Sequence, residues 1–131
     1  MLRILIADDH EIVRRGLKQI LEEEFSSLHV KEVSDTGTLL TKAMNEDWDL
    51  VITDIAMPGG SALNALTKIR VQKSTLPILV VSTYPEEQYG QHVIMAGANG
   101  YISKNKVPEK LAPAVREILS GKKFFEFELI V

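Results

Sequence analysis

The chain has 131 residues, a formal net charge of −3, and a composition that is 45% hydrophobic and 25% charged. This length suits one domain with a proper core, and this composition is typical of a folded globular protein rather than a disordered or fibrous one. The charge gives no sign of nucleic-acid binding by this stretch itself, and the lack of cysteine excludes disulfides and thiolate metal sites. No apolar run has the length of a membrane span, and the first residues turn acidic too early for a signal peptide, so we expect a cytoplasmic protein without membrane contact.

Short runs rich in β-branched residues alternate with helical patterns five times along the chain. We expect strands over 3–7, 30–33, 50–54, 77–82 and 100–103, and helices over 12–25, 38–46, 62–70, 86–97 and 109–121. The first, third and fourth strands are nearly continuous apolar runs, as is typical of parallel strands covered on both faces. The alternation therefore predicts an α/β fold: a doubly wound, five-stranded parallel sheet with helices on both faces.

Glycine and proline refine the expected helix ends. Gly97 and Gly121 stand where a helix C-terminus favours glycine. Pro113 falls inside the last predicted helix, where it removes a backbone hydrogen bond. Either that helix starts late, with Pro113 in its first turn, or it kinks.

Polar residues mark the carboxyl ends of the predicted strands, where doubly wound sheets bind their ligands. Asp8 and Asp9 follow the first strand, Asp54 ends the third, Ser82 ends the fourth and Lys104 follows the fifth. Each has an ordinary explanation, because an aspartate at a strand end is usually a turn former or a helix cap and a loop lysine is usually solvated. Their convergence on one edge of a single sheet favours a functional site.

Three carboxylates crowded at one edge repel each other unless a cation lies between them. Oxygen ligands with neither histidine nor cysteine among them favour Mg²⁺ over zinc or copper. Lys104 and Ser82 could each bind a phosphate oxygen. Asp54, at a strand–loop junction, could then attack phosphorus and carry an acyl phosphate. We therefore predict that Asp54 is phosphorylated.

Four motifs also carry a family resemblance: "ILIADDHEIVRRGL", "DLVITDIAMPGG", "PILVVST" and "AGANGYISK". Together they resemble the receiver domain of bacterial two-component response regulators, which implies a flavodoxin-like sheet of order 2-1-3-4-5. The opening "ADDH…VRRGL" and the ending "LAPAVREILSGKKFF" are most similar to the NarL/FixJ group, whose members usually continue into a LuxR-type helix-turn-helix. The resemblance implies a receiver domain over 1–121 and, over 122–131, the start of a linker to an output domain that this chain does not contain.

The resemblance also assigns roles around the acidic cluster. Asp54 would accept the phosphoryl group from a sensor histidine kinase. Asp9, Asp54 and the backbone carbonyl of Ala56 would ligate Mg²⁺, and Asp8 would hold the ion through water. The domain would thus be a phosphoacceptor switch rather than an enzyme, promoting only its own phosphorylation and dephosphorylation.

A second set of roles concerns the switch. Ser82 would bond the phosphoryl group, Lys104 would pair with it, and Tyr101 lies at the family's switch aromatic position. When Ser82 moves toward phosphate, Tyr101 is expected to swing inward and change the face made by the fourth helix, fifth strand and fifth helix. A homodimer would then form on phosphorylation, and DNA would be bound only through the output domain.

Several other functions are compatible with parts of this pattern. A stand-alone phosphorelay receiver without DNA-binding output shares every site residue. A haloacid-dehalogenase-type phosphatase would need an acid at Ala56, and a dinucleotide-binding oxidoreductase would need a glycine fingerprint after the first strand. Two further features have more than one explanation. His10 could touch the site, although a surface position at a helix start is the expectation. The apolar ending "FFEFELIV" has three explanations, of which we favour a cut between receiver and output domain over an extra packed element or a dimer contact.

Overall fold

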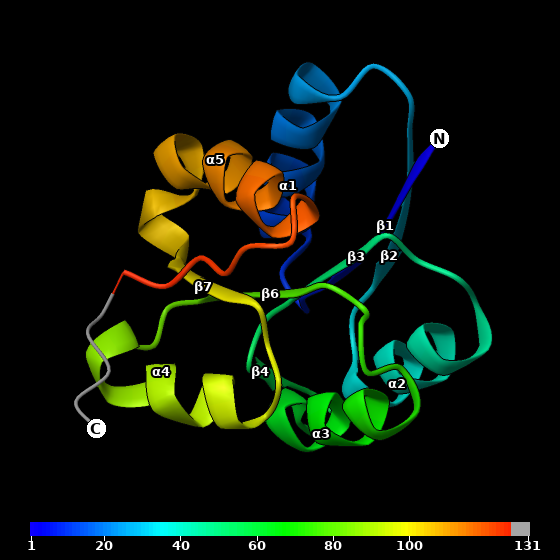
Figure 1. Cartoon of the computed structure of the whole chain (residues 1–131), viewed down its shortest axis with the longest axis vertical. Helices are drawn as coiled ribbons and strands as arrows, with labels where there is room; N and C mark the ends of the chain where they lie inside the picture. The colour runs from blue at the N-terminus through cyan, green and yellow to red at the C-terminus, as the bar shows by residue number, and fades with distance from the viewer. Residues whose placement is uncertain (127–131) are drawn as a thin grey trace.

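The computed structural model describes residues 1–126, which form a parallel sheet covered by helices on both faces (Figure 1). The sheet strands are β1 (Leu2–Ala7), β2 (Leu28–Val33), β3 (Leu50–Thr53), β6 (Ile78–Ser82) and β7 (Gly100–Ser103). The helices are α1 (Glu11–Glu24), α2 (Thr36–Asn45), α3 (Ala62–Gln72), α4 (Glu86–Met95) and α5 (Val107–Leu119), the last preceded by a 3-10 turn, η1 (Lys104–Lys106).

The strands lie in the order β2-β1-β3-β6-β7, and every pairing in this sheet is parallel. This is the predicted order 2-1-3-4-5, so the doubly wound fold is confirmed. The winding reverses between β1 and β3, which brings the ends of these two strands side by side. The residues that follow β1 and β3 therefore meet at one edge of the sheet.

Alternate residues of the strands feed two separate cores. In β1, Ile4 and Ile6 join the core beneath α1 and α5, whereas Leu5 and Ala7 join the core beneath α2, α3 and α4. Successive strand side chains point to opposite faces, so a strand covered on both faces must be apolar throughout. The nearly continuous apolar runs of β1, β3 and β6 follow from that requirement.

The helix ends agree with the glycine positions and exclude one of the two alternatives for Pro113. Gly97 and Gly121 both have positive φ, 98° and 94°, just beyond α4 and α5. Helix α5 begins at Val107 and continues through Pro113, which excludes the late start, one of the two alternatives that the sequence left open. Pro108, not Pro113, occupies the first turn, where the lack of an N–H removes no helical bond.

A short antiparallel pair, which the sequence pattern did not predict, follows Asp54. It consists of β4 (Ala56–Met57) and β5 (Gly60–Ser61), joined by a turn in which Gly59 and Gly60 have positive φ. The Thr36 hydroxyl donates to the Gly60 carbonyl at 2.7 Å, and the Thr36 N–H donates to the Pro58 carbonyl at 2.9 Å. These bonds fix the loop beside Asp54 to the start of α2.

The segment after α5 packs against the sheet as far as the structure describes it. Phe124 makes a parallel bridge to Gly100 at the outer edge of β7. Of the three explanations of the apolar ending, an extra packed element thus holds for residues 124–126. Residues 127–131 lie outside the described residues. The domain boundary at residue 121 stays a prediction. Within the described chain, no helix combines the length and the apolar character needed to cross a bilayer.

Candidate functional site

The turn from β1 into α1 carries the first two acids of the site. The Asp8 side chain is buried, whereas Asp9 is exposed. The Arg14 guanidinium donates to the Asp8 carbonyl at 2.7 Å and to Glu32 at 3.0 Å. Arg14, which the sequence analysis did not single out, therefore fixes the turn that presents both acids.

Asp54 follows β3 directly and is 5% exposed. Its N–H donates to the Ala7 carbonyl at 2.9 Å, which continues the pairing of β3 with β1 for one residue. Its Oδ1 accepts the N–H of Ile55 at 2.7 Å, and its Oδ2 accepts from the Lys104 ammonium at 2.8 Å. The buried carboxylate is thus oriented by two donors rather than left unpaired.

Lys104 bridges two of the acids. Its Nζ lies 2.9 Å from Asp8 Oδ2 and 2.8 Å from Asp54 Oδ2. Burial by itself would lower the pKa of Lys104, but the hydrogen bonds and charges of Asp54 and Asp8 outweigh it and raise that pKa above its ordinary value. The ammonium therefore stays charged and offsets part of the negative charge of the cluster.

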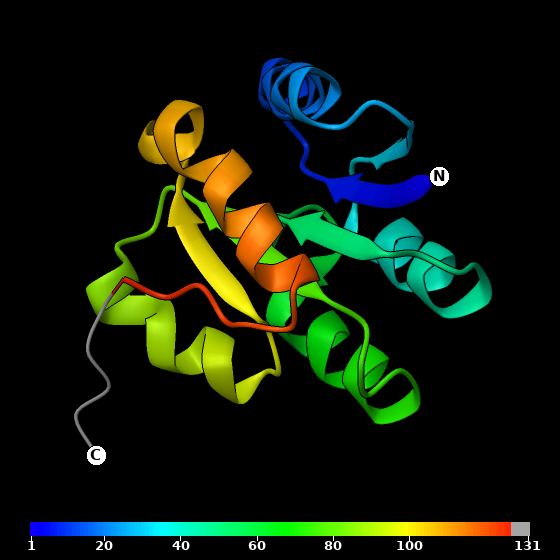
Figure 2. The ribbon, with the colours of Figure 1, turned by 45° about the horizontal axis from the view of Figure 1, so that its top comes forward.

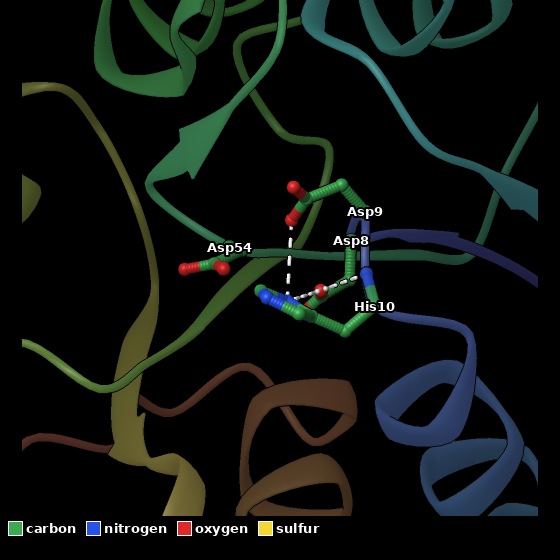
Figure 3. Close-up of side chains that lie close together, drawn as sticks. All are labelled: Asp8, Asp9, His10 and Asp54. Atoms are coloured by element: carbon green, nitrogen blue, oxygen red, sulfur yellow. Dashed lines mark hydrogen bonds and ion pairs between the residues drawn. The ribbon is translucent and has the colours of Figure 1, made fainter.

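His10 lies inside the same cluster (Figure 3). Its Nδ1 is 2.8 Å from Asp8 Oδ1 and 3.2 Å from Asp9 Oδ1, and its backbone N–H donates to Asp8 Oδ1 at 2.8 Å. As expected, His10 lies at a helix start and is largely exposed: it is the N-cap of α1. It touches the site as well, and its place directly after the acidic pair is the signal that pointed to it.

The donor set of this cluster fits a hard divalent cation. Ligand atoms of Asp8, Asp9, His10 and Asp54 all lie within 4.8 Å of one another. Three carboxylates against one ammonium leave an excess of negative charge, which a divalent ion would balance. The oxygen-rich set matches the preference of Mg²⁺ and Ca²⁺ rather than that of softer metals.

Ser82 and Tyr101 meet beside the cluster at the end of the sheet. Ser82 is buried and its Oγ accepts the Tyr84 N–H at 3.1 Å, while the Tyr101 hydroxyl donates to the Tyr84 carbonyl at 2.5 Å. Burial raises the pKa of Tyr101 and outweighs the opposing effect of a hydrogen bond with Ser82. The ring is already fully buried, so the expected inward swing does not begin from an exposed ring in this structure. The Tyr84 carbonyl is a partner that no sequence pattern reveals.

The structure thus gathers the predicted acids, Lys104 and Ser82 at the carboxyl edge of the sheet. A family model described as response regulator receiver domain matches residues 4–116. This chain belongs to that family. The receiver domain shares 37% identity over 129 residues with the oxygen regulatory protein NreC of Staphylococcus haemolyticus (strain JCSC1435), and 31% over 129 residues with the response regulator UvrY of Escherichia coli (strain K12). Each alignment covers 98% of this chain and 59% of the relative.

Solved structures agree with the same assignment. A LuxR-family two-component response regulator from Aurantimonas sp. SI85-9A1 superposes with a TM-score of 0.85 at 28% identity, covering 93% of this chain and 87% of that one. The non-phosphorylated receiver domain of the stress response regulator RcsB from Escherichia coli gives 0.85 at 28%, covering 96% and 98%. The resemblance to receivers with LuxR-type outputs is confirmed. The receiver spans only 59% of the length of the curated relatives.

Proposed function

We propose that this receiver domain accepts a phosphoryl group on Asp54 from a sensor histidine kinase and thereby switches an output. The observation that carries the proposal is the Asp54 carboxylate, which is buried yet oriented by Ile55 N–H and the Lys104 ammonium. It also lies within 4.8 Å of the other acids. A strand-end carboxylate held in this way suits a nucleophile better than a turn former.

In the transfer step, an oxygen of Asp54 forms a bond to phosphorus while the bond from phosphorus to the imidazole nitrogen of the donor breaks. The product is an acyl phosphate on Asp54 and a histidine that has regained its nitrogen lone pair. Lys104, now paired with Asp54 and Asp8, would move to a phosphoryl oxygen, and the Ser82 hydroxyl would bond another. The chain's own part is therefore to orient the nucleophile and to bind the transferred group.

The cation proposed for the cluster is Mg²⁺. Asp9, Asp54 and the Ala56 carbonyl would ligate it directly, and Asp8 would hold it through water. When bound, the ion neutralises charge on the phosphoryl oxygens and on the nucleophile. The oxygen-rich donor set described above supports this choice.

The output is proposed to be transcription regulation through a DNA-binding domain. The support is that the relatives are regulators considerably longer than this chain and that a solved relative is described as two RcsB dimers bound to two parallel DNAs. A phosphorelay receiver without such an output is the alternative. Reading the parent gene beyond Val131 separates the two, because only the first predicts a helix-turn-helix there.

Phosphorylation of Asp54 is tested by incubation with acetyl phosphate and Mg²⁺, followed by intact-mass measurement. The native chain should gain one phosphoryl group, and Asp54→Asn should gain none. The matched control is Asp47→Asn at an exposed aspartate, which should be phosphorylated like the native chain. An adduct that persists in Asp54→Asn would place the phosphoacceptor elsewhere.

A further inference from the structure

The outer edge of β7 is covered by the chain itself. Because β7 is the last strand of the sheet, its outer edge would otherwise leave backbone groups unpaired. The Phe124 N–H donates to the Asn99 carbonyl at 2.9 Å, and the Tyr101 N–H donates to the Phe124 carbonyl at 3.0 Å. Figure 2 shows the segment after α5, in red, running beside β7, in yellow. We call residues 122–126 the edge segment.

Two adjacent phenylalanines of the edge segment straddle the sheet. Phe124 packs against the core beneath α1 and α5, and Phe125 packs against the core beneath α2, α3 and α4, which contains Tyr101. Gly100 allows this approach, since a Cβ there would lie 2.8 Å from Ile118 Cδ1 and 3.0 Å from the Phe124 carbonyl oxygen. The segment is therefore anchored in both layers rather than laid over the surface.

Glu126, at the end of the edge segment, connects two helices. Its backbone N–H donates to Glu86 in the first turn of α4 at 2.7 Å. Its carboxylate lies 3.5 Å from the Lys110 ammonium of α5. The segment thus spans the face made by α4, β7 and α5, which is the face that the expected switch would alter.

Tyr101 is consequently held at two points. Its hydroxyl is fixed by the Tyr84 carbonyl near Ser82, and its backbone N–H is fixed by Phe124. We propose that the edge segment docks as a short sixth strand that holds Tyr101 in its buried position and thereby couples to the phosphoryl site. The docking follows from the contacts alone, whereas the coupling rests on the proposed function, in which phosphoryl binding favours the same buried position.

Coupling of this kind is reciprocal. If the docked segment and the phosphoryl group both favour a buried Tyr101, undocking the segment must weaken phosphoryl binding, and phosphoryl binding must tighten the docking. The edge segment is then a positioning element of the switch. Substitutions in it should change affinity at Asp54 without touching any residue of the acidic cluster.

The experiment compares the native chain with Phe124→Pro, which removes the donor to Asn99, and with Phe125→Ala, which keeps both backbone bonds but removes packing next to the Tyr101 core. Lys123→Ala, at an exposed position of the same segment, is the matched control. Amide exchange of Tyr101, followed by NMR without any ligand, reports docking. Binding of beryllofluoride with Mg²⁺, followed by NMR titration, reports the phosphoryl site.

Exchange at Tyr101 should be at least about tenfold faster in Phe124→Pro, and unchanged in Lys123→Ala. Beryllofluoride affinity should fall by about fivefold or more in Phe124→Pro and in Phe125→Ala, but not in the control. Equal exchange rates in all chains would overturn the docking, and equal affinities despite faster exchange would overturn the coupling. A native chain that binds no beryllofluoride would contradict the proposed function and the coupling with it, while the exchange rates would still decide the docking.

Discussion

Asp9 differs from the other two acids of the cluster in its surroundings. Asp8 and Asp54 are buried and share the Lys104 ammonium, whereas Asp9 is partly exposed and lies 3.2 Å from His10 Nδ1. Lys104 therefore offsets charge mainly on the buried pair. The carboxylate most available to an incoming cation is that of Asp9.

Replacing Asp9 by alanine should weaken Mg²⁺ binding by about tenfold or more, because the proposed direct ligand is lost while Lys104 still holds the buried pair. Calorimetric titration with Mg²⁺ measures this. Glu11→Ala is the control, since Glu11 is a nearby exposed acid that pairs with Arg15 instead. Unchanged Mg²⁺ affinity in Asp9→Ala would move the ion to another site.

The residues of the cluster were largely predictable, because the carboxyl ends of adjacent parallel strands must meet at one edge. The place of His10 after the acidic pair indicates that it could touch the site, but its distances to Asp8 and Asp9 depend on the geometry of the β1–α1 turn, which no periodicity encodes. The backbone contacts of Arg14 and Tyr84 were not predictable for a related reason. A carbonyl acceptor leaves no trace in the residue type that carries it.

At the scale of the elements, Asp35 is the N-cap of α2. The N–H and the hydroxyl of Thr38 donate to its carboxylate at 2.7 and 2.8 Å. The bond from the Thr38 N–H, followed by that from the Thr38 hydroxyl, holds the pKa of Asp35 below its ordinary value. The folded pKa is thus lower than the unfolded one. The contribution of this cap to stability is present above the unfolded pKa and is lost as the pH falls through the folded pKa.

The free energy of unfolding of the native chain should therefore fall on acidification in that window more steeply than that of Asp35→Asn. Asparagine also caps a helix but does not titrate. Urea unfolding of both chains over a series of acidic pH values measures the difference. Parallel pH profiles would show that the cap carries no titrating contribution.

Helix α5 contains an interior proline whose removal should stabilise the fold. Pro113 cannot donate to the carbonyl four residues earlier, and its ring crowds that carbonyl. Pro113→Ala should raise the free energy of unfolding by about 1–3 kcal/mol, the usual cost of an interior proline less its benefit in the unfolded chain. The control, Pro108→Ala in the first turn, should stabilise nothing, because no helical bond is gained there. A Pro113→Ala chain that is no more stable than the native chain would contradict this account.

Proline propensity alone leaves a late start of α5 open, and the packing of the helix excludes it. Val107, Leu111 and Ile118 are buried, and burial of this apolar face outweighs one missing backbone bond. The β4–β5 pair escaped prediction because two-residue strands are too short for any alternation to appear. Long, strongly patterned elements were predictable, and elements held by single backbone contacts were not.

At the scale of the whole molecule, strand order and layering follow from the pattern of continuous apolar strands and intervening helices. Docking of the edge segment does not, because its pairing with β7 uses backbone groups that every residue carries. That docking bears on assembly, since it covers part of the α4–β7–α5 face. Met95, the last residue of α4, is 83% exposed.

Phosphorylation should promote self-association through the α4–β7–α5 face. A bound group shifts such an equilibrium only by its differential affinity for the two states, so phosphoryl binding must favour one position of Tyr101 over the other. Ser82 is placed for this, because its Oγ accepts the N–H of Tyr84, whose carbonyl holds the Tyr101 hydroxyl. Ser82→Ala should therefore uncouple assembly from phosphoryl binding more than it lowers binding itself.

Sedimentation velocity with and without beryllofluoride, on the native chain and on Ser82→Ala, measures this coupling. The native chain should sediment as a larger assembly with beryllofluoride, whereas Ser82→Ala should bind the anion yet sediment as it does without it. Ser74→Ala, at an exposed serine, should behave like the native chain. Tyr101 is already buried in this structure, so we expect a modest change of mass. A native chain with the same mass in both conditions would contradict the proposed switch for this chain.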